Sequence, residues 1–207
     1  DEQRAGRDTG VLHDAVTVNF LYSDLLCCPL DKLALRQENT QLRCASGHSF
    51  DIARQGYVNL LLPGDKRSRD PGDSKEMVVA RRAFLSSGHY EPIAQRLIEL
   101  VRPLTAVDSV IVDAGCGEGY YLEQLRAHLP ASRYSAPTVI GFDISKQAVQ
   151  AATRRFAATW LVASNRNIPL APGSVDCLLS LFSFPVFESF RTALKDGGTL
   201  LTVNAGP

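Results

Sequence analysis

A glycine-rich loop directly after a short apolar run is the feature that most constrains the fold of this chain. The apolar run 110–112 ends in an acid, Asp113, and Gly115, Gly117 and Gly119 follow at alternate positions. Glycine lets a backbone turn sharply and approach a ligand closely. The start of the helix that follows offers free N–H groups to an anion. The pattern therefore predicts a strand, a ligand-binding turn and a helix, which together form the first unit of a parallel α/β sheet.

Strand-like and helical segments alternate along the chain from about residue 73 onward. Five short apolar runs are expected as strands: Ser109–Val112, Thr138–Phe142, Thr159–Ala163, Val175–Leu181 and Thr199–Val203. Helices are expected between them, for example over Tyr121–Leu129 and Gln147–Phe156. Asp73 and Glu76 have the spacing of a capping box ahead of an earlier helix. The alternation predicts an α/β fold with a mostly parallel sheet.

The acid and the glycine loop fit a ligand that carries both an ammonium group and a carboxylate. The helix start suits the carboxylate, and Asp113 is placed to attract the ammonium. The methionine half of S-adenosylmethionine has both groups. A dinucleotide-binding loop would need a glycine where this chain has Tyr120. A purely structural turn is the other alternative.

Polar residues also follow the next strand-like runs. Asp143 ends the second run and is placed to accept hydrogen bonds from both hydroxyls of a ribose, although a helix cap is the alternative. Ser164 and Asn165 follow the third run, where the adenine amino group would lie. The segment 181–185, beside the transferable methyl group, lacks the Asn/Asp-Pro-Pro-aromatic motif of exocyclic-amine methylation. The sequence assigns no catalytic residue, and the general base stays unknown.

Cysteine and histidine residues cluster ahead of this domain, in residues 25–62. Cys28 and Asp31 are three residues apart, and Cys44 and His48 are four apart. Two ligand pairs at such spacing suit a tetrahedral zinc ion in a zinc ribbon. Asp31 then stands in the place of a second cysteine, and Cys27 is a further candidate thiolate. The alternative is a ribbon-like module that apolar packing holds together without metal.

Composition limits the compartment and the partners. The 22 basic and 22 acidic residues cancel, whereas general polyanion binders are usually basic. No apolar run has the length of a membrane span, and five cysteines do not suggest a disulfide framework. We therefore expect a cytoplasmic protein with no membrane contact. Any contact with nucleic acid would come from the basic residues of the connector 63–74 and of the helix after it. These are Lys66, Arg67, Arg69, Lys75, Arg81 and Arg82. The alternative is that the connector and this helix face are only solvated.

Longer motifs resemble one known family. They are Gln55-Gly-Tyr-Val-Asn-Leu-Leu61, Lys66-Arg-Ser-Arg-Asp-Pro-Gly-Asp-Ser74, Arg81-Arg-Ala-Phe-Leu85 and Gly88-His-Tyr90. From about residue 27 to residue 207 the chain resembles the 23S ribosomal RNA (guanine-N1)-methyltransferases. The resemblance implies an RNA-recognition zinc ribbon ahead of a Rossmann-like class I methyltransferase domain. It also implies methyl transfer from S-adenosylmethionine to N1 of a guanine in a 23S ribosomal RNA hairpin. It also implies cofactor contacts by Tyr90, Gly119 and Tyr120.

Composition and turn-rich segments divide the chain into an extension (1–24), the ribbon (25–62), the connector (63–74) and the methyltransferase domain (75–207). The chain departs from the family at Asp31, which replaces a zinc cysteine, and at Phe184, which lies near the family's Ala-Pro. The family also continues beyond Pro207. We therefore expect a sheet that lacks its last strands, with the run 199–203 open at its outer edge.

The extension or a second copy of the chain would then have to cover that edge, so a homodimer stays an open alternative. Two other functions also stay open. One is a small-molecule S-adenosylmethionine-dependent methyltransferase, and the other is a catalytically inactive RNA- or protein-binding module.

Overall fold

The predicted α/β architecture is present in the computed structural model, which describes residues 20–65, 71–132 and 135–206. One nine-stranded sheet runs through the described residues in the order β1-β2-β3-β4-β7-β6-β5-β8-β9. Its strands, in chain order, are β1 (Arg36–Glu38), β2 (Gln41–Arg43), β3 (Ser49–Ala53), β4 (Tyr57–Asn59), β5 (Val110–Ala114), β6 (Thr138–Asp143), β7 (Thr159–Val162), β8 (Val175–Leu181) and β9 (Leu194–Val203). The pairs from β4 to β9 are parallel, and those from β1 to β4 are antiparallel.

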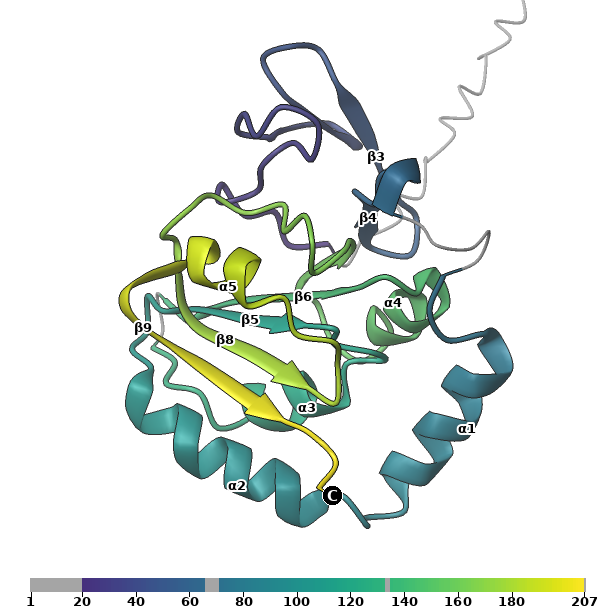
Figure 1. The fold of residues 1–207 in the computed structure, drawn as a ribbon, viewed down its shortest axis with the longest axis vertical. Coiled ribbons are helices and arrows are strands. Elements are labelled where there is room, and N and C mark those ends of the chain that lie inside the picture. Colours follow the sequence, from purple (N-terminus) through teal and green to yellow (C-terminus); the bar gives the residue numbers. More distant parts are fainter. Residues whose placement is uncertain (1–19, 66–70, 133–134, 207) are drawn as a thin grey trace, which may run out of the picture.

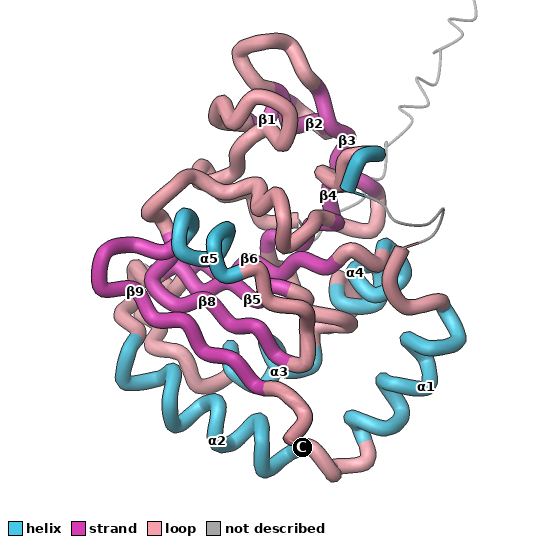
Figure 2. Tube along the Cα trace, in the orientation of Figure 1, coloured by secondary structure: helices cyan, strands magenta, loops and turns pink. Residues whose placement is uncertain are grey.

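Helices cover both faces of the parallel part of the sheet. They are α1 (Lys75–Ser86), α2 (Glu91–Val101), α3 (Tyr120–Arg126), α4 (Lys146–Ala152) and α5 (Phe187–Ala193), with short 3-10 turns at Pro63–Asp65 and Arg102–Leu104. Figure 1 shows α2 and α3 on one face of the sheet and α5 on the other, while α1 extends away at the side. The helix and strand layers are distinguished by colour in Figure 2.

Two apolar cores result from the alternation of side chains along the strands. On β5, Val110, Val112 and Ala114 belong to the core under α5, which also includes Leu35 and Leu42 of the ribbon module. Ile111 belongs to the opposite core, which side chains of α2, α3 and α4 complete. Because successive strand residues point to opposite faces, Asp113 lies on the same face as Ile111, toward α3.

The ribbon module is joined to the methyltransferase sheet by backbone pairing. Strand β4 pairs in parallel with β7, with Val58 opposite Leu161. At the other end of the module, the Cys27 N–H donates to the carbonyl of Pro169 at 2.9 Å. The sequence placed β4 in a separate module, whereas the structure adds this strand to the sheet. The ribbon is therefore held against the domain that carries the glycine loop.

All five predicted strands form, with differences at their ends. Strand β9 begins at Leu194 rather than Thr199, because α5 passes directly into a strand that pairs Leu194 with Val175 before a bulge. The predicted capping box at Asp73 is wrong. Ser74 caps α1 by accepting the Met77 N–H at 3.3 Å, whereas Asp73 forms an ion pair with Arg81.

Strand β9 lies at the end of the sheet. Within the described residues it pairs only with β8, in agreement with the open edge that we expected. The described end of the N-terminal extension lies elsewhere, since Phe20 pairs with Ala158 next to β7. The homodimer stays a prediction. Among the described helices, none combines the length and the apolar character needed to cross a lipid bilayer.

Candidate functional site

The glycine loop has the backbone that the sequence predicted. All three glycines have positive φ, with +90° at Gly115, +55° at Gly117 and +82° at Gly119. A Cβ atom on Gly115 would overlap the side chain of Ser183, and one on Gly119 would lie 2.9 Å from the Trp160 ring. Both the backbone conformation and the lack of space thus require glycine at these two positions.

Asp143 connects the end of β6 to this loop. Its Oδ2 atom accepts the Gly117 N–H at 3.0 Å, and its Oδ1 atom accepts the Ser145 N–H at 2.7 Å. Burial raises the pKa of the Asp143 carboxyl above its usual value. Each carboxylate oxygen has a second lone pair, so the side chain retains acceptor capacity toward a ligand while it holds the loop.

Two buried polar atoms near the loop lack a partner. Asp113 is 1% exposed, and its Oδ1 atom accepts no hydrogen bond in the described part of the chain; the Tyr121 hydroxyl is in the same state. Burial and the neighbouring Asp143 raise the pKa of Asp113 to about 8. Buried polar groups in proteins almost always have partners, so each of these two atoms is a candidate to bind a polar group of a ligand.

Two pockets meet at the loop, and Gly115 lines both. The larger pocket, about 370 Å³, is lined by Asp143, Ser164 and Asn165. The smaller, about 190 Å³, is lined by four of the aromatic and acidic residues considered above: Tyr90, Asp113, Tyr120 and Tyr121. The structure thus brings together all the predicted cofactor residues, with the ribose and adenine candidates on one side of the loop and the methionine candidates on the other. Gly119 lies at the helix start behind them.

The donor set fits S-adenosylmethionine. In the larger pocket Asp143 would hold the ribose, next to Ser164, Asn165 and Ile144 for the adenine. In the smaller pocket the unpartnered Asp113 and Tyr121 would receive the polar end of the methionine part. The observation behind this fit is the orphaned Asp113 oxygen, which an ammonium group would satisfy.

An ion cluster that the sequence did not predict holds the loop from behind. Arg155 donates from Nε to the backbone carbonyl of Glu118 at 2.9 Å and from Nη2 to its carboxylate at 2.6 Å. Arg155 also bonds Glu123 of α3. Both Glu118 and Arg155 are buried. The cluster fixes Glu118, which lies between Gly117 and Gly119, and no local sequence signal pairs two residues that are 37 positions apart.

The connector also contributes to the larger pocket, and sequence reasoning missed this contribution. Pro71 and Gly72 line the larger pocket. Gly72, with φ of +82°, packs directly on Ser145, and the Ser145 hydroxyl donates to the carbonyl of Asp73 at 2.7 Å. The end of the motif that resembles the RNA methyltransferases therefore forms a wall of this pocket.

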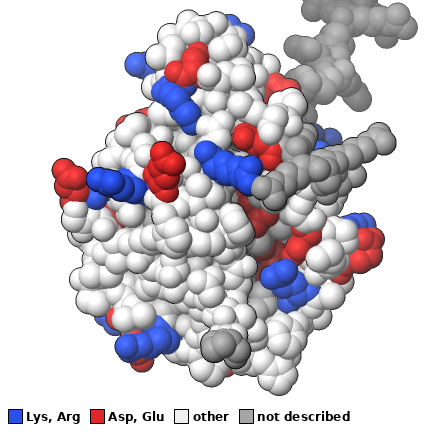
Figure 3. All heavy atoms as spheres, in the orientation of Figure 1, with Lys and Arg blue, Asp and Glu red and all other residues white. Residues whose placement is uncertain are grey.

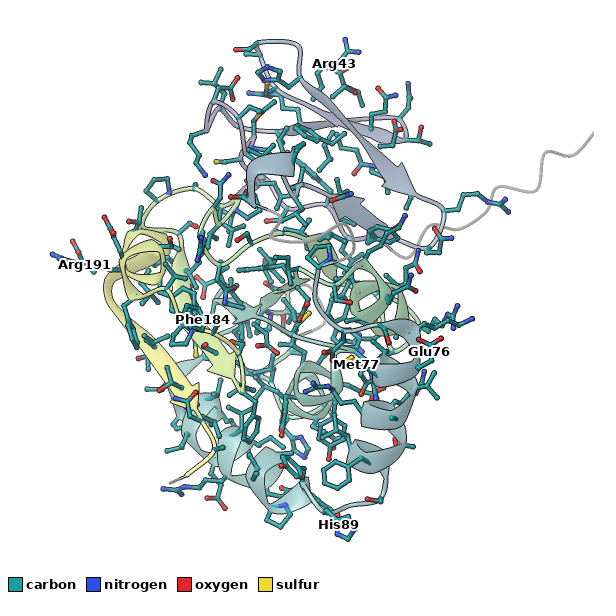
Figure 4. All side chains as sticks on the ribbon, turned by 45° about the vertical axis from the view of Figure 1, so that its right-hand side comes forward. Arg43, Glu76, Met77, His89, Phe184 and Arg191 are labelled. Carbon is teal, nitrogen blue, oxygen red and sulfur yellow. The ribbon has the colours of Figure 1, made fainter. Side chains whose placement is uncertain are left out.

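The basic residues proposed for RNA are divided by the structure. Lys66, Arg67 and Arg69 lie outside the described residues. Arg81 lines the smaller pocket and forms an ion pair with Asp73 at 3.0 Å, and Arg82 is exposed on α1. Figure 3 shows charges of both signs interspersed on the face in view, and Figure 4 shows Arg43 at the outer end of the ribbon module and Arg191 on α5.

The metal candidates lie close together in the ribbon module. The ligand atoms of Cys28, Asp31, Cys44 and His48 all lie within 4.8 Å of one another. His48 Nδ1 is 3.5 Å from Cys28 Sγ, 3.4 Å from Cys44 Sγ and 3.1 Å from Asp31 Oδ2. Zinc bonds of about 2.0–2.3 Å in a tetrahedron place ligand atoms about 3.3–3.8 Å apart. The two sulfur, one nitrogen and one oxygen atoms therefore fit a tetrahedral zinc ion.

Cys27 is not part of this group. Its thiol lies 3.8 Å from the carbonyl of Leu25, and its N–H is bonded to Pro169. The carboxylate of Asp31 is therefore the fourth candidate ligand, and it takes the place that a cysteine would have. Burial raises the pKa of the Cys28 thiol, and a bound cation would favour its thiolate.

Comparison with known proteins agrees with this arrangement. Residues 26–69 match the family model of the RlmA N-terminal zinc ribbon, and residues 111–201 match a methyltransferase domain model. The chain is 36% identical over 182 residues to the 23S rRNA (guanine(748)-N(1))-methyltransferase of Streptomyces fradiae, covering 86% of this chain and 62% of that protein. It is also 36% identical over 200 residues to a Micromonospora griseorubida protein assigned to the 23S rRNA (guanine-N(1)-)-methyltransferases, covering 86% of this chain and 64% of that protein.

The fold has relatives among solved structures. A Methanococcus maripaludis protein assigned to the S-adenosyl-L-methionine-dependent methyltransferases superposes with a TM-score of 0.53 at 18% identity, over 66% of this chain and 67% of that one. The chain spans less than two thirds of the length of the two relatives in sequence, at 64% and 62%. The chain thus combines a zinc ribbon of the RlmA type with a methyltransferase domain, and over 86% of its length it is similar to 23S rRNA (guanine-N1)-methyltransferases.

Proposed function

We propose that this protein transfers the methyl group of S-adenosylmethionine to N1 of a guanine in a 23S ribosomal RNA hairpin. The observation that carries the proposal is the pair of pockets that Gly115 lines on both sides. The smaller pocket contains the unpartnered Asp113, and the larger contains Asp143. A zinc ribbon of the RlmA type is attached to the same sheet. Two relatives that are 36% identical over 86% of this chain are named 23S rRNA (guanine-N1)-methyltransferases.

The residues of the chain act mainly by positioning. When bound, the cofactor supplies a methyl group that its sulfonium makes electrophilic. Asp143 would hold the ribose, and Ser164 and Asn165 would face the adenine. Alignment of the reacting atoms can account for much of the rate acceleration in such a reaction. The proton that guanine N1 carries must leave to the solvent as the new N–C bond forms.

RNA recognition is assigned to the ribbon and to the basic residues around the connector. A guanine in a helix is stacked and inaccessible at N1, so a hairpin loop or a flipped base is the expected substrate. We expect Lys66, Arg67, Arg69, Arg81 and Arg82 to lie along the path of the phosphates. Arg81 would lie both on this phosphate path and at the cofactor, since it also lines the smaller pocket. Because the proposed substrate is ribosomal RNA, we expect the enzyme to act in the cytoplasm.

The test is transfer of a tritiated methyl group from labelled cofactor to 23S ribosomal RNA that lacks the modification. The expected result is label at N1 of one guanine, mapped by a stop in reverse transcription. The Asp143→Asn variant is the matched control, because it keeps the shape of the side chain and removes its charge. Label transferred only to small acceptors would indicate a small-molecule methyltransferase. Cofactor binding without transfer to any acceptor would indicate an inactive binding module.

A further inference from the structure

The turn after β8 has an unusual backbone and spans both pockets. Phe182 lines the smaller pocket, while Ser183 and Phe184 line the larger. Phe182 has φ of +53°, a left-handed conformation that is rare for a bulky residue. Such strain persists where the surroundings impose it and is frequent at functional sites. The turn lies at the junction of the pockets, where the methyl group of a bound cofactor is expected.

Hydrogen bonds fix the backbone of this turn on several sides. The Phe182 N–H donates to the carbonyl of Val203 at 2.7 Å. The Ser183 hydroxyl donates to the carbonyl of Ala114 at 2.7 Å. The Asn165 side-chain amide donates to the carbonyl of Phe184 at 2.7 Å. Pro185 follows and further limits the backbone of Phe184. The position of Phe184 is therefore set before any substrate arrives.

The ring of Phe184 is nevertheless exposed. With 78% of its surface accessible, it is the most exposed large apolar side chain among the described residues. Figure 4 labels it on the segment between β8 and α5. An apolar ring on a fixed backbone at the rim of a pocket is suited to contact a ligand. The ring differs in this respect from Phe182, which contacts the rings of Tyr90 and Tyr121.

We propose that Phe184 stacks on the guanine that accepts the methyl group and holds it, unstacked from the RNA, over the junction of the two pockets. This inference rests on the function proposed above. A flipped base loses its stacking neighbours, and an aromatic side chain replaces them without regard to base identity. Phe184 thus contributes to binding of the base, while the RNA sequence is recognised elsewhere.

The test compares three variants in methyl transfer to the RNA hairpin. Phe184→Leu removes the aromatic face and keeps an apolar side chain, and Phe184→Trp retains a face for stacking. Phe187→Leu is the matched control, because Phe187 is also an exposed phenylalanine of this segment, at 62%, and is not among the residues that line either pocket. We expect Phe184→Leu to raise the KM for RNA about tenfold. The other two variants should stay near the wild-type value.

Cofactor affinity, measured by calorimetry, separates this role from others. Phe184→Leu should leave the Kd of S-adenosylmethionine unchanged, and a loss of cofactor affinity would show that the ring covers the adenosine instead. An unchanged KM for RNA in Phe184→Leu, in a wild type that methylates RNA, would overturn the inference and leave the proposed function intact. A wild type that methylates no ribosomal RNA would overturn both.

Discussion

Asp143 and Gly117 are joined by a hydrogen bond of 3.0 Å from the glycine N–H to the Oδ2 atom of the carboxylate. The bond links the ends of two neighbouring strands, β5 and β6, at the edge where the cofactor pockets lie. The acid proposed for the ribose therefore also sets the position of the loop proposed for the methionine half. A single substitution at this position affects both halves of the site.

Asp143→Asn should weaken S-adenosylmethionine binding by about 1.5–3 kcal/mol, because charge-assisted hydrogen bonds to the ribose are lost. Calorimetry of the purified protein measures the change. Asp176→Asn is a suitable control, since Asp176 is a carboxylate that accepts from Val110 and Lys195 away from both pockets. Wild-type affinity in Asp143→Asn would remove the ribose assignment.

Cofactor binding should release a proton from Asp113. Burial and Asp143 raise the pKa of this carboxyl to about 8, so it is mostly protonated at pH 7. An ammonium group beside it would favour the charged form and lower that pKa. Binding enthalpies at pH 7 in buffers of different ionisation enthalpy should reveal a large fraction of one proton released. Asp113→Asn should abolish the release, and an equal release in that variant would contradict the assignment.

The same raised pKa predicts how Asp113 affects stability without cofactor. The carboxyl ionises near pH 3.9 in the unfolded chain but only near 8 in the folded protein. Between these values the folded state binds more protons, so its contribution favours folding at low pH and declines as pH rises. Denaturant unfolding from pH 5 to 8 should show a shallower decline in Asp113→Asn than in wild type. A slope that is identical in the two proteins would show that Asp113 is ionised in the folded state.

Elemental analysis of protein that has never met a chelator should find about one zinc ion per chain. Cys28, Asp31, Cys44 and His48 provide the donor set. Asp31→Cys should slow loss of the metal to a chelator, because a thiolate binds zinc more strongly than a single carboxylate oxygen does in this setting. Cys27→Ser is the control and should retain the metal. Protein without zinc would leave the ribbon held by apolar packing.

Arg155→Ala should lower the free energy of unfolding by about 3–5 kcal/mol, since it leaves the buried Glu118 without its partner. Arg155→Lys should restore only part of the loss, because an ammonium group lacks the planar fork of donors with which Arg155 bonds the carbonyl and the carboxylate of Glu118. Arg96→Ala removes an exposed ion pair with Glu99 and should change stability by less than about 1 kcal/mol. Equal effects of the two alanine variants would show that the Arg155 cluster does not support the loop.

Replacement of Lys66, Arg67 and Arg69 by alanine should weaken RNA binding and flatten its dependence on salt, because fewer phosphate counterions are released. Cofactor affinity should not change. Arg96, Arg102 and Arg126, replaced together, are a control for loss of three positive charges elsewhere. If RNA binding in the two triple variants is the same, the connector is only a solvated linker.

Sequence alone was sufficient for the features that depend on local spacing. Short apolar runs separated by helical segments located the five strands of the methyltransferase domain, because such runs are a property of neighbouring residues. The Gly-x-Gly-x-Gly loop predicted the turn at the candidate cofactor site for a similar reason, since its glycines have positive φ angles that other residues rarely adopt. The spacing of Cys28, Asp31, Cys44 and His48 indicated the metal cluster in the same way.

The tertiary structure decided what depends on contacts between distant residues. Strand β4 joins the methyltransferase sheet only because its backbone reaches the free edge of β7. Arg155 meets Glu118, and Gly72 meets Ser145, across the folded sheet. Whether Phe184 is exposed or buried depends on how the turn after β8 packs against β9 and Asn165. Such contacts leave no periodic pattern or motif in the sequence. They depend on strand order and side-chain packing, and both are defined only once the chain has folded.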